Sequence, residues 1–234
     1  MVAPVQISTL SNWGGTSLSA TTTLTGVTAG NHIILLAMHG DLGGNGPTLS
    51  ASDAQGSYAI DVDSNLGLGL ARVTMFRLAN ANAGTHAITC TASTGTTANS
   101  VGTTIAIEVP PVTLDQSNIA GGNGTAVSVS PTSSLAAVNE LAVAGIFANN
   151  LLTGGGTFPP TGGTGTYISL VHAHDGDGDY QILTSTAGVG ANWGTLSFSG
   201  KWAAVIGAYN AIATAPPPPL APMSLGGMNV QVCQ

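Results

Sequence analysis

The sequence predicts an all-β protein, an antiparallel β-sandwich of the jelly-roll type, and three observations lead to this prediction. Thr, Val and Ile alternate with polar residues over short runs, which is the period-2 pattern of half-buried strands. Gly, Asn, Asp and Pro separate these runs at intervals that suit turns. No stretch of the sequence combines a sustained 3.6-residue apolar period with helix caps.

The expected strands follow one another with short connections. In the run 100–109, Ile105 and Ile107 fall on one strand face with a smaller residue between them. The runs 32–39 and 140–147 are apolar on both faces, which places each at the centre of a sheet that is covered on both sides. The expected strands are 4–9, 19–25, 31–38, 57–62, 70–79, 85–92, 100–109, 124–130, 139–148, 166–172, 179–186, 194–199 and 202–212.

Two pairs of expected strands resemble each other. HIILLAMH at 32–39 and ELAVAGIF at 140–147 both follow an Asn, and TTIAIEV at 103–109 resembles AAVIGAYN at 203–210. Each pair is separated by about a hundred residues. Residues 1–213 are therefore expected to form one β-sandwich domain, and either two related halves or chance similarity between strands explains the repeats.

The composition changes after this domain. The segment TAPPPPLAP at 214–222 contains four consecutive prolines, which favour a stiff polyproline II linker. Residues 223–234 are too short to fold alone, but their apolar residues alternate as in a strand. This pattern predicts a C-terminal docking tail for a neighbouring subunit, with a disordered terminus as the alternative. The assembly residues of this tail are Met228, Val230, Val232 and Cys233.

The chain carries very few charges. Charged residues make up 6% of it, against about 25% in a typical soluble domain. Either much of the surface meets other protein, or Ser, Thr, Asn and Gly carry its solvation. The only basic residues are Arg72, Arg77 and Lys201, and the formal net charge is −7. Three scattered cations are too few to displace counterions from phosphates, which excludes nucleic acid and an anionic membrane surface as partners.

The N-terminal residues MVAPVQISTL have neither the basic start nor the apolar block of a signal peptide. The longest apolar run, at 33–38, is far too short to span a bilayer, so synthesis in the cytoplasm is expected. Two cysteines imply no disulfide framework. Cys90 shares a strand face with Ile88 and is expected to be buried, and Cys233 is a candidate for a bridge to a neighbouring subunit.

The densest polar cluster is HAHDGDGDY at 172–180. Closely spaced carboxylates on a flexible loop suit Ca²⁺, although an EF-hand would need a Glu where this chain has Thr186. Two histidines with one Asp form a second candidate, a Zn²⁺ site. The third interpretation is a solvated hairpin loop, in which Gly makes the turn and Asp gives solubility. The candidate metal ligands are His172, His174, Asp175, Asp177 and Asp179.

No other pattern predicts catalysis, and the chain is expected not to be an enzyme. There is no GxSxG motif, and the Gly-rich loops lack the Lys of a phosphate-binding loop. Asp61 and Asp63 share a strand face, as two glycosidase carboxylates would, but such pairs are more common at turns and edges. Trp13 and Trp193 lie between Asn and Gly in expected loops, so they are candidates for stacking on a sugar ring, with burial as the alternative.

Several turn-and-strand segments follow one another in a characteristic order. They are VTAGNHIILLAMHG at 27–40, DAQGSY at 53–58, ANAGTHAITCTAS at 81–93, VGTTIAIEVP at 101–110, NELAVAGIFA at 139–148 and KWAAVIGAYNA at 201–211. In this order they resemble a β-sandwich domain of tailed-bacteriophage structural proteins and bacterial surface proteins, over roughly residues 1–213. DAQGSY is similar to the Asp-Ser-Gln-Gly turn of that family, although the usual Asn-Thr is reduced to Ser57. The resemblance implies a particle component or an adhesive module, and it carries no catalytic residues.

The leading hypothesis is a non-enzymatic virion protein, in capsid decoration or in a fibre or tail, whose partners are other subunits and in particular further copies of itself. Such particles assemble in the host cytoplasm, which fits the N-terminus. The runner-up is an extracellular or cell-surface module that binds a host glycan through its tryptophans. The third hypothesis is a Ca²⁺-dependent or hydrolytic enzyme, which depends on the 172–179 cluster alone.

Overall fold

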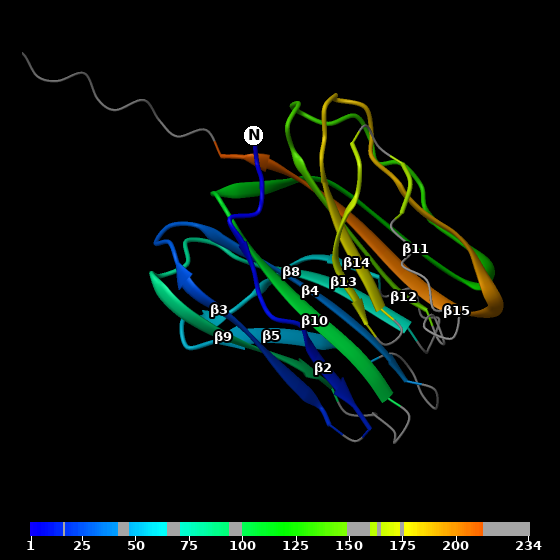
Figure 1. Cartoon of the computed structure of the whole chain (residues 1–234), viewed down its shortest axis with the longest axis horizontal. Helices are drawn as coiled ribbons and strands as arrows, with labels where there is room; N and C mark the ends of the chain where they lie inside the picture. Colours follow the sequence, from blue (N-terminus) through cyan, green and yellow to red (C-terminus); the bar gives the residue numbers. More distant parts are fainter. Residues whose placement is uncertain are drawn as a thin grey trace, which may run out of the picture.

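The structure, a computed structural model, describes residues 1–15, 17–41, 47–64, 71–93, 100–148, 160–162, 165–173 and 176–212. Within these residues every strand pair is antiparallel, and the secondary structure is all-β. The described part of the chain contains no helix that has the length and hydropathy of a membrane span. The predicted antiparallel β-sandwich is therefore confirmed, and it contains three sheets (Figure 1).

The six-stranded sheet lies in the middle of the stack, and we call it the central sheet. Both β1 and β2 pair with β10, and the order continues through β4 and β8 to β7 at the opposite edge. Its strands are β1 (Gln6–Ile7), β2 (Ser11–Gly14), β10 (Ser100–Val109), β4 (His32–Asp41), β8 (Ala71–Leu78) and β7 (Ala59–Asp63).

The other two sheets have five and four strands. The five-stranded sheet runs in the order β11 (Val112–Val129), β15 (Ala191–Ala211), β12 (Leu141–Ala148), β14 (Gly176–Ile182) and β13 (Ile168–Ala173). The four-stranded sheet runs in the order β3 (Ser19–Val27), β9 (Gly84–Ala92), β5 (Leu49–Asp53) and β6 (Gly56–Ser57). Strands β3 and β13 are thus edge strands of their sheets.

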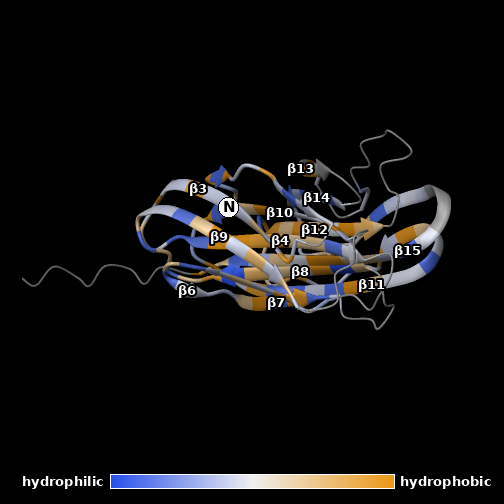
Figure 2. Ribbon diagram, turned by 90° about the horizontal axis from the view of Figure 1, so that it is seen from below, coloured by the Kyte–Doolittle hydropathy of each residue, from blue (hydrophilic) through white to orange (hydrophobic). Residues whose placement is uncertain are grey.

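The central sheet buries apolar side chains on both of its faces, because residues of opposite parity on one strand point to opposite sides. On one face, Leu36 and Ile107 belong to a core shared with Val205 of the five-stranded sheet. On the other face, Leu35 belongs to a core shared with Ile88 of the four-stranded sheet. Figure 2 shows these hydrophobic strands running through the interior of the stack. The prediction that 32–39 lies at the centre of a two-sided sheet is confirmed.

The five-stranded sheet is also covered on both faces. Residues of β11 and β15 beyond the paired part of β12, including Val127 and Trp193, fold back over the sheet. They pack against Ala144 and Ile146 on the face that points away from the central sheet. The run 140–147 is therefore also two-sided, as predicted.

Glycines of the five-stranded sheet receive large side chains of the central sheet. A Cβ atom on Gly145 would lie 2.7 Å from Leu36 Cδ1, and one on Gly178 would lie 2.6 Å from Leu36 Cδ2. Contacts this short are not tolerated between carbon atoms, so no other residue fits at either position without a shift of Leu36. Leu36 is 1% exposed and thus fixes the distance between the two sheets.

Several strand boundaries differ from the sequence expectation. The strands β2 and β5 were not predicted, because their side chains are mostly small or polar. Strand β11 begins at Val112 rather than at 124. The sequence pattern missed its first part because these residues are half-exposed and rich in Gly and Asn. The runs 194–199 and 202–212 belong to one strand, β15. The similar runs 32–39 and 140–147 form β4 and β12, and the similar runs 103–109 and 203–210 lie in β10 and β15. Strand β4 pairs with β10 in the central sheet, and β12 pairs with β15 in the five-stranded sheet.

The contact of Leu36 with Gly145 predicts a non-additive pair of mutations. Leu36→Ala should cost about 3 kcal/mol of unfolding free energy through the cavity that it leaves. Gly145→Ala alone should cost about 1–3 kcal/mol by overpacking, but about 1 kcal/mol less in the Leu36→Ala background, where the added methyl has room. Urea unfolding of the four proteins measures this coupling. Leu135→Ala, in the core on the other face of the sheet, is the control and should combine additively with Gly145→Ala.

Candidate functional site

Two carboxylates, Asp177 and Asp179, lie together inside the protein. They are 1% and 0% exposed, respectively, and they occupy alternate positions of β14. The register pairs Asp179 with Ala144 and Asp177 with Ile146, so both point to the face that the folded-back part of β11 and β15 covers. The sequence interpretation of these aspartates as a solvated hairpin loop is therefore wrong.

The neighbouring glycines explain why the aspartates point inward. A Cβ atom on Gly176 would lie 2.9 Å from Thr103 Cγ2, and Gly178 is held against Leu36 as described above. The positions of β14 that face the central sheet, 176 and 178, therefore have room only for glycine. The positions that alternate with them face the other side of the sheet, and these carry the carboxylates. Alternating glycine in a strand, a sign of close approach by a neighbouring element, is the signal in the sequence that indicates this strand.

Burial, followed by the charge of Asp177, raises the pKa of Asp179 to about 9. Asp179 is therefore protonated at neutral pH, because two adjacent carboxylates in an apolar interior do not both ionise. Trp193 is 4% exposed and lies beside this pair. Within the described residues, no hydrogen bond of ordinary geometry reaches either carboxyl oxygen of Asp179 or Nε1 of Trp193. A buried acid with a strongly shifted pKa is the first candidate for a functional group in this fold.

The structure brings together only part of the predicted metal cluster. The backbone of His172 lies in β13 opposite Asp177, whereas His174 and Asp175 lie outside the described residues. Across the described chain, no three His, Cys, Asp or Glu side chains are arranged to hold a metal ion. The Ca²⁺ and Zn²⁺ sites stay predictions, with Asp177 and Asp179 as the two ligands that are placed side by side.

A second polar cluster surrounds Asp53 in the turn between β5 and β6. Oδ1 of Asp53 accepts a hydrogen bond of 2.7 Å from the amide of Gln55, and Oδ2 accepts one of 3.0 Å from the Tyr58 hydroxyl. Nδ1 of His86 lies 2.6 Å from the same Oδ2, and its Nε2 lies 3.0 Å from the carbonyl of Asn82. A shallow depression of about 240 Å³ lies beside these residues.

The charges of this turn cluster stabilise each other. Burial acts to raise the pKa of Asp53, but the hydrogen bond from His86 and those from the turn lower it overall. Burial acts to lower the pKa of His86, but its bonds to the Asn82 carbonyl and to Asp53 raise it overall. Both ring nitrogens of His86 are engaged, so this histidine has no nitrogen available as a base. The cluster fixes the turn and leaves the depression as a surface feature.

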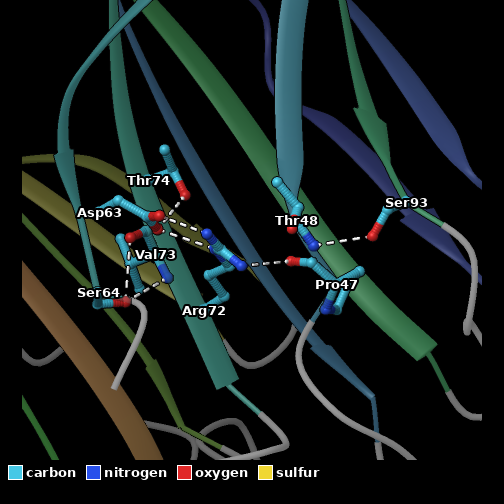
Figure 3. A network of polar contacts seen from close by, with 8 residues as sticks. All are labelled: Pro47, Thr48, Asp63, Ser64, Arg72, Val73, Thr74 and Ser93. Atoms are coloured by element: carbon cyan, nitrogen blue, oxygen red, sulfur yellow. Dashed lines mark hydrogen bonds and ion pairs between the residues drawn. The ribbon is translucent and has the colours of Figure 1, made fainter. Parts of the chain in front are cut away.

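Asp63 forms an ion pair with Arg72 of the neighbouring strand β8 (Figure 3). Arg72 Nε donates to Asp63 Oδ1 over 2.8 Å, and the Thr74 hydroxyl donates to the same oxygen over 3.0 Å. Arg72 Nη1 also donates to the carbonyl of Pro47, 3.3 Å away. Arg72 is 6% exposed, so this network ties the start of β5 to the edge of the central sheet.

Asp61 forms a similar pair with Arg77. Arg77 Nε donates to Asp61 Oδ2 over 2.8 Å, and Nη2 donates to Asp61 Oδ1 over 3.2 Å, so the guanidinium binds the carboxylate with two nitrogens. Nη1 donates to the carbonyl of Val112, at the start of β11. Asp61 and Asp63, considered above as a glycosidase pair, are thus edge residues that each neutralise an arginine.

These contacts leave the described surface nearly free of charge. Glu108 is 0% exposed and accepts hydrogen bonds from the Thr28 amide and from Asn31 Nδ2. With the exception of Asp41 and Asp175, whose side chains are not described, every charged side chain of the protein is buried or half-buried. The sequence contains few charged residues, and the described surface exposes even fewer of them.

Hydroxyl groups replace charges on the outer face of the four-stranded sheet. Thr21 and Thr89 stand opposite each other, and their hydroxyl oxygens are 2.9 Å apart. The outward residues of this face alternate with the buried core residues of the same strands. They are Ser19, Thr21, Thr23, Thr25, Ser50, Ser52, Thr85, Ala87, Thr89 and Thr91. Ser and Thr thus carry the solvation of this sheet, which is one of the two explanations expected from the composition.

The two tryptophans proposed for sugar stacking are buried. Trp13 is 5% exposed, lies edge-on to His39 with ring centroids 5.0 Å apart, and covers Gly102. Trp193 belongs to the core beside Asp179. The exposed interpretation of both residues is therefore wrong, because neither indole presents a face to solvent. Cys90 is buried beside Ile88, as predicted.

Comparison with models of known protein families, with curated proteins and with solved structures finds no match for this chain. The linker at 214–222 and the tail at 223–234, with Met228, Val230, Val232 and Cys233, lie outside the described residues. Both segments stay sequence predictions.

The protonated state of Asp179 predicts how stability depends on pH. An unfolded Asp titrates near pH 4, whereas Asp179 holds its proton in the folded state up to about pH 9. Unfolding therefore releases a proton between these values, and the contribution of this group falls as pH rises from about 4 to 9. Asp179→Asn should raise the unfolding free energy at pH 8 by about 1–3 kcal/mol and should flatten its decline with pH.

Urea unfolding at pH 5, 7 and 8 measures this effect. The control is Asp115→Asn, which changes a half-buried carboxylate on β11. An Asp179→Asn protein whose stability declines with pH as steeply as that of the original chain would contradict a protonated Asp179 in the folded state.

Proposed function

We propose that this chain is a non-enzymatic structural protein of a bacteriophage particle, in capsid decoration or in a fibre or tail, which acts by packing against neighbouring subunits. The observation on which this proposal depends is the distribution of charge. Arg72 and Arg77, two of the three basic residues, are used inside the fold, and the described surface presents hydroxyls and apolar side chains instead. A free surface of a soluble domain normally carries interspersed charges.

Exposed apolar side chains support the same proposal. The first 18 residues contribute Val5, Ile7, Leu10 and Leu18, which are 55%, 43%, 39% and 40% exposed, respectively. Val5, Ile7 and Leu10 lie in or beside β1 and β2 at this edge of the central sheet, and Leu18 directly precedes β3. The charged residue of β10 at this edge, Glu108, is 0% exposed, so the described residues of the edge expose no charged side chain. Apolar groups that gather at an uncharged sheet edge are typical of an interface with another protein.

The polar clusters support a structural role as well. Asp53, Asp61 and Asp63 each accept several hydrogen bonds that connect neighbouring strands or close a turn. Such bonds stabilise the fold and leave these carboxylates fully engaged. The assignment to a phage particle is supported by the resemblance of segments 27–40, 53–58 and the later strands to phage structural domains.

Light scattering of the full-length protein after gel filtration tests the proposal. An interface of neutral groups is insensitive to salt, so we expect an oligomer of the same mass at low ionic strength and at about 1 M salt. The double variant Ile7→Lys/Leu10→Lys should lower the mass, because it places charges at the apolar edge. The control Thr85→Lys/Thr91→Lys adds the same charge to the hydroxyl face and should leave the mass unchanged. A monomeric full-length chain at both salt concentrations would contradict self-assembly.

A further inference from the structure

The edge strand β3 has no charged residue and no proline. Natural edge strands are usually protected by charges, prolines or short length, because their unpaired backbone groups invite another strand. Among the edge strands of the described sheets, β7 carries Asp61 and Asp63, β11 carries Asp115, and β1, β2, β6 and β13 are shorter. With nine residues, β3 is the longest described edge strand without these protective features.

The register of β3 identifies which backbone groups face outward. The amide of Ala92 donates to the carbonyl of Leu18, so these two residues form a hydrogen-bonded pair of the β3–β9 ladder. Antiparallel ladders alternate between bonded and non-bonded pairs. The amides and carbonyls of Ser19, Thr21 and Thr23 therefore point away from β9, toward the free side of the sheet. This free stretch ends near the register shift that follows Leu24.

Exposed apolar side chains accompany this free edge. The hydroxyl of Thr22, on the inner face of β3, contacts the Thr9 carbonyl and the Ser8 hydroxyl. These contacts hold the segment that joins β1 and β2 against β3, so Leu10 lies close to the edge strand and is 39% exposed. A strand that fits here needs apolar residues on its inner face and polar residues on its outer face, next to the hydroxyls.

The C-terminal tail of this chain has that pattern. Its apolar residues Met228, Val230 and Val232 alternate with Asn229 and Gln231, and it contains no charge and no proline. We propose that residues 228–232 of a neighbouring copy add to β3 as an antiparallel fifth strand of the four-stranded sheet. This inference rests on the proposed function, because it names the contact through which subunits pack. The added backbone hydrogen bonds would bind the tail, and the alternation would select its face.

The stiffness of the linker favours a neighbouring copy over the same chain. Between Ile212, the last described residue, and Met228, the chain contains four consecutive prolines and would span roughly 50 Å in the polyproline II conformation. A polyproline segment is stiff over several residues, so a tail on such a linker would reach a neighbouring copy more readily than it would fold back on its own domain. The neutral tail also matches the neutral edge, since neither side needs an ionic partner to be desolvated.

The antiparallel pairing found throughout the described sheets, together with the alternation, defines a register. When Val230 lies opposite Thr22 on the inner face, Gln231 lies opposite Thr21 on the outer face. The same register places Cys233 opposite Ser19, at the start of β3. Residues opposite each other in neighbouring strands have Cα atoms about 5 Å apart, a distance that a disulfide bond spans.

A single substitution therefore tests the inference. Full-length Ser19→Cys, oxidised mildly, should form a disulfide with the native Cys233 of another chain. The linked chains would be seen on a non-reducing gel, and mass spectrometry would find a peptide pair that joins position 19 to Cys233. The Ser19→Cys/Cys233→Ser protein should lack this linkage. Cys90 does not compete, because it is fully buried and burial raises the pKa of its thiol to about 12.

The matched control is Thr91→Cys. Thr91 is exposed on the same face and is the register partner of Ser19 in β9, one strand further from the edge. We expect at least a tenfold slower linkage to Cys233 from this position. Equal rates at the two positions, or no linkage from Ser19→Cys, would overturn the inference. A disulfide within a single chain would overturn docking on a neighbour.

The proposed function is tested separately by the molar mass. If the full-length protein is oligomeric but Ser19→Cys does not link to Cys233, the subunits pack through another surface and only the docking of the tail is wrong. If the full-length protein is monomeric and unlinked, both proposals fail.

Discussion

The close packing of the central sheet against the five-stranded sheet is the constraint on which the rest of the structure depends. Leu36 reaches across the core to Gly145 and Gly178, where even a Cβ atom would lie within 2.7 Å of its methyl groups. This contact explains why β14 alternates glycine with aspartate. The face of β14 toward the central sheet has no room for side chains, so the side chains of this strand lie on the opposite face. The buried pair of Asp177 and Asp179 is thus a consequence of how the two sheets approach each other, and its raised pKa follows from that burial.

The second constraint is the use of charge inside the fold. Arg72 and Arg77 bind carboxylates of β7, and Glu108 accepts hydrogen bonds from the turn before β4, so these groups hold strands together instead of facing water. The outer face of the four-stranded sheet carries mostly Ser and Thr hydroxyl groups, and the edge near Leu10 is apolar. Charges are thus used for stability inside the fold, and the neutral edges that remain are the surfaces through which the proposed assembly would take place.

The strand alternation of the sequence predicted the all-β fold and the two-sided runs at 32–39 and 140–147, because burial on both faces demands continuous apolar residues. The same rule failed for β2, β5 and the first half of β11, where pairing with neighbours stabilises polar and small residues in strands. For the candidate site, the sequence singled out Asp177 and Asp179, but it began the expected strand only at 179 and offered a Ca²⁺ loop and a solvated hairpin among its interpretations, since alternating Gly resembles turn chemistry. The sequence left open whether Trp13 and Trp193 are exposed or buried, because the neighbouring Asn and Gly residues do not indicate which other segments pack against the indole.

Hydrogen–deuterium exchange of the β3 amides most directly tests the claim that this neutral edge is an assembly surface. We expect slow exchange at Ser19, Thr21 and Thr23 in the full-length protein and fast exchange in a chain that ends at Ile212, because the proposed tail strand is the partner of these outward amides. The amides of Ala20 and Thr22 point to β9 and should be protected equally in both proteins. Equal exchange of the outward amides with and without the tail would show that the tail does not pair with β3.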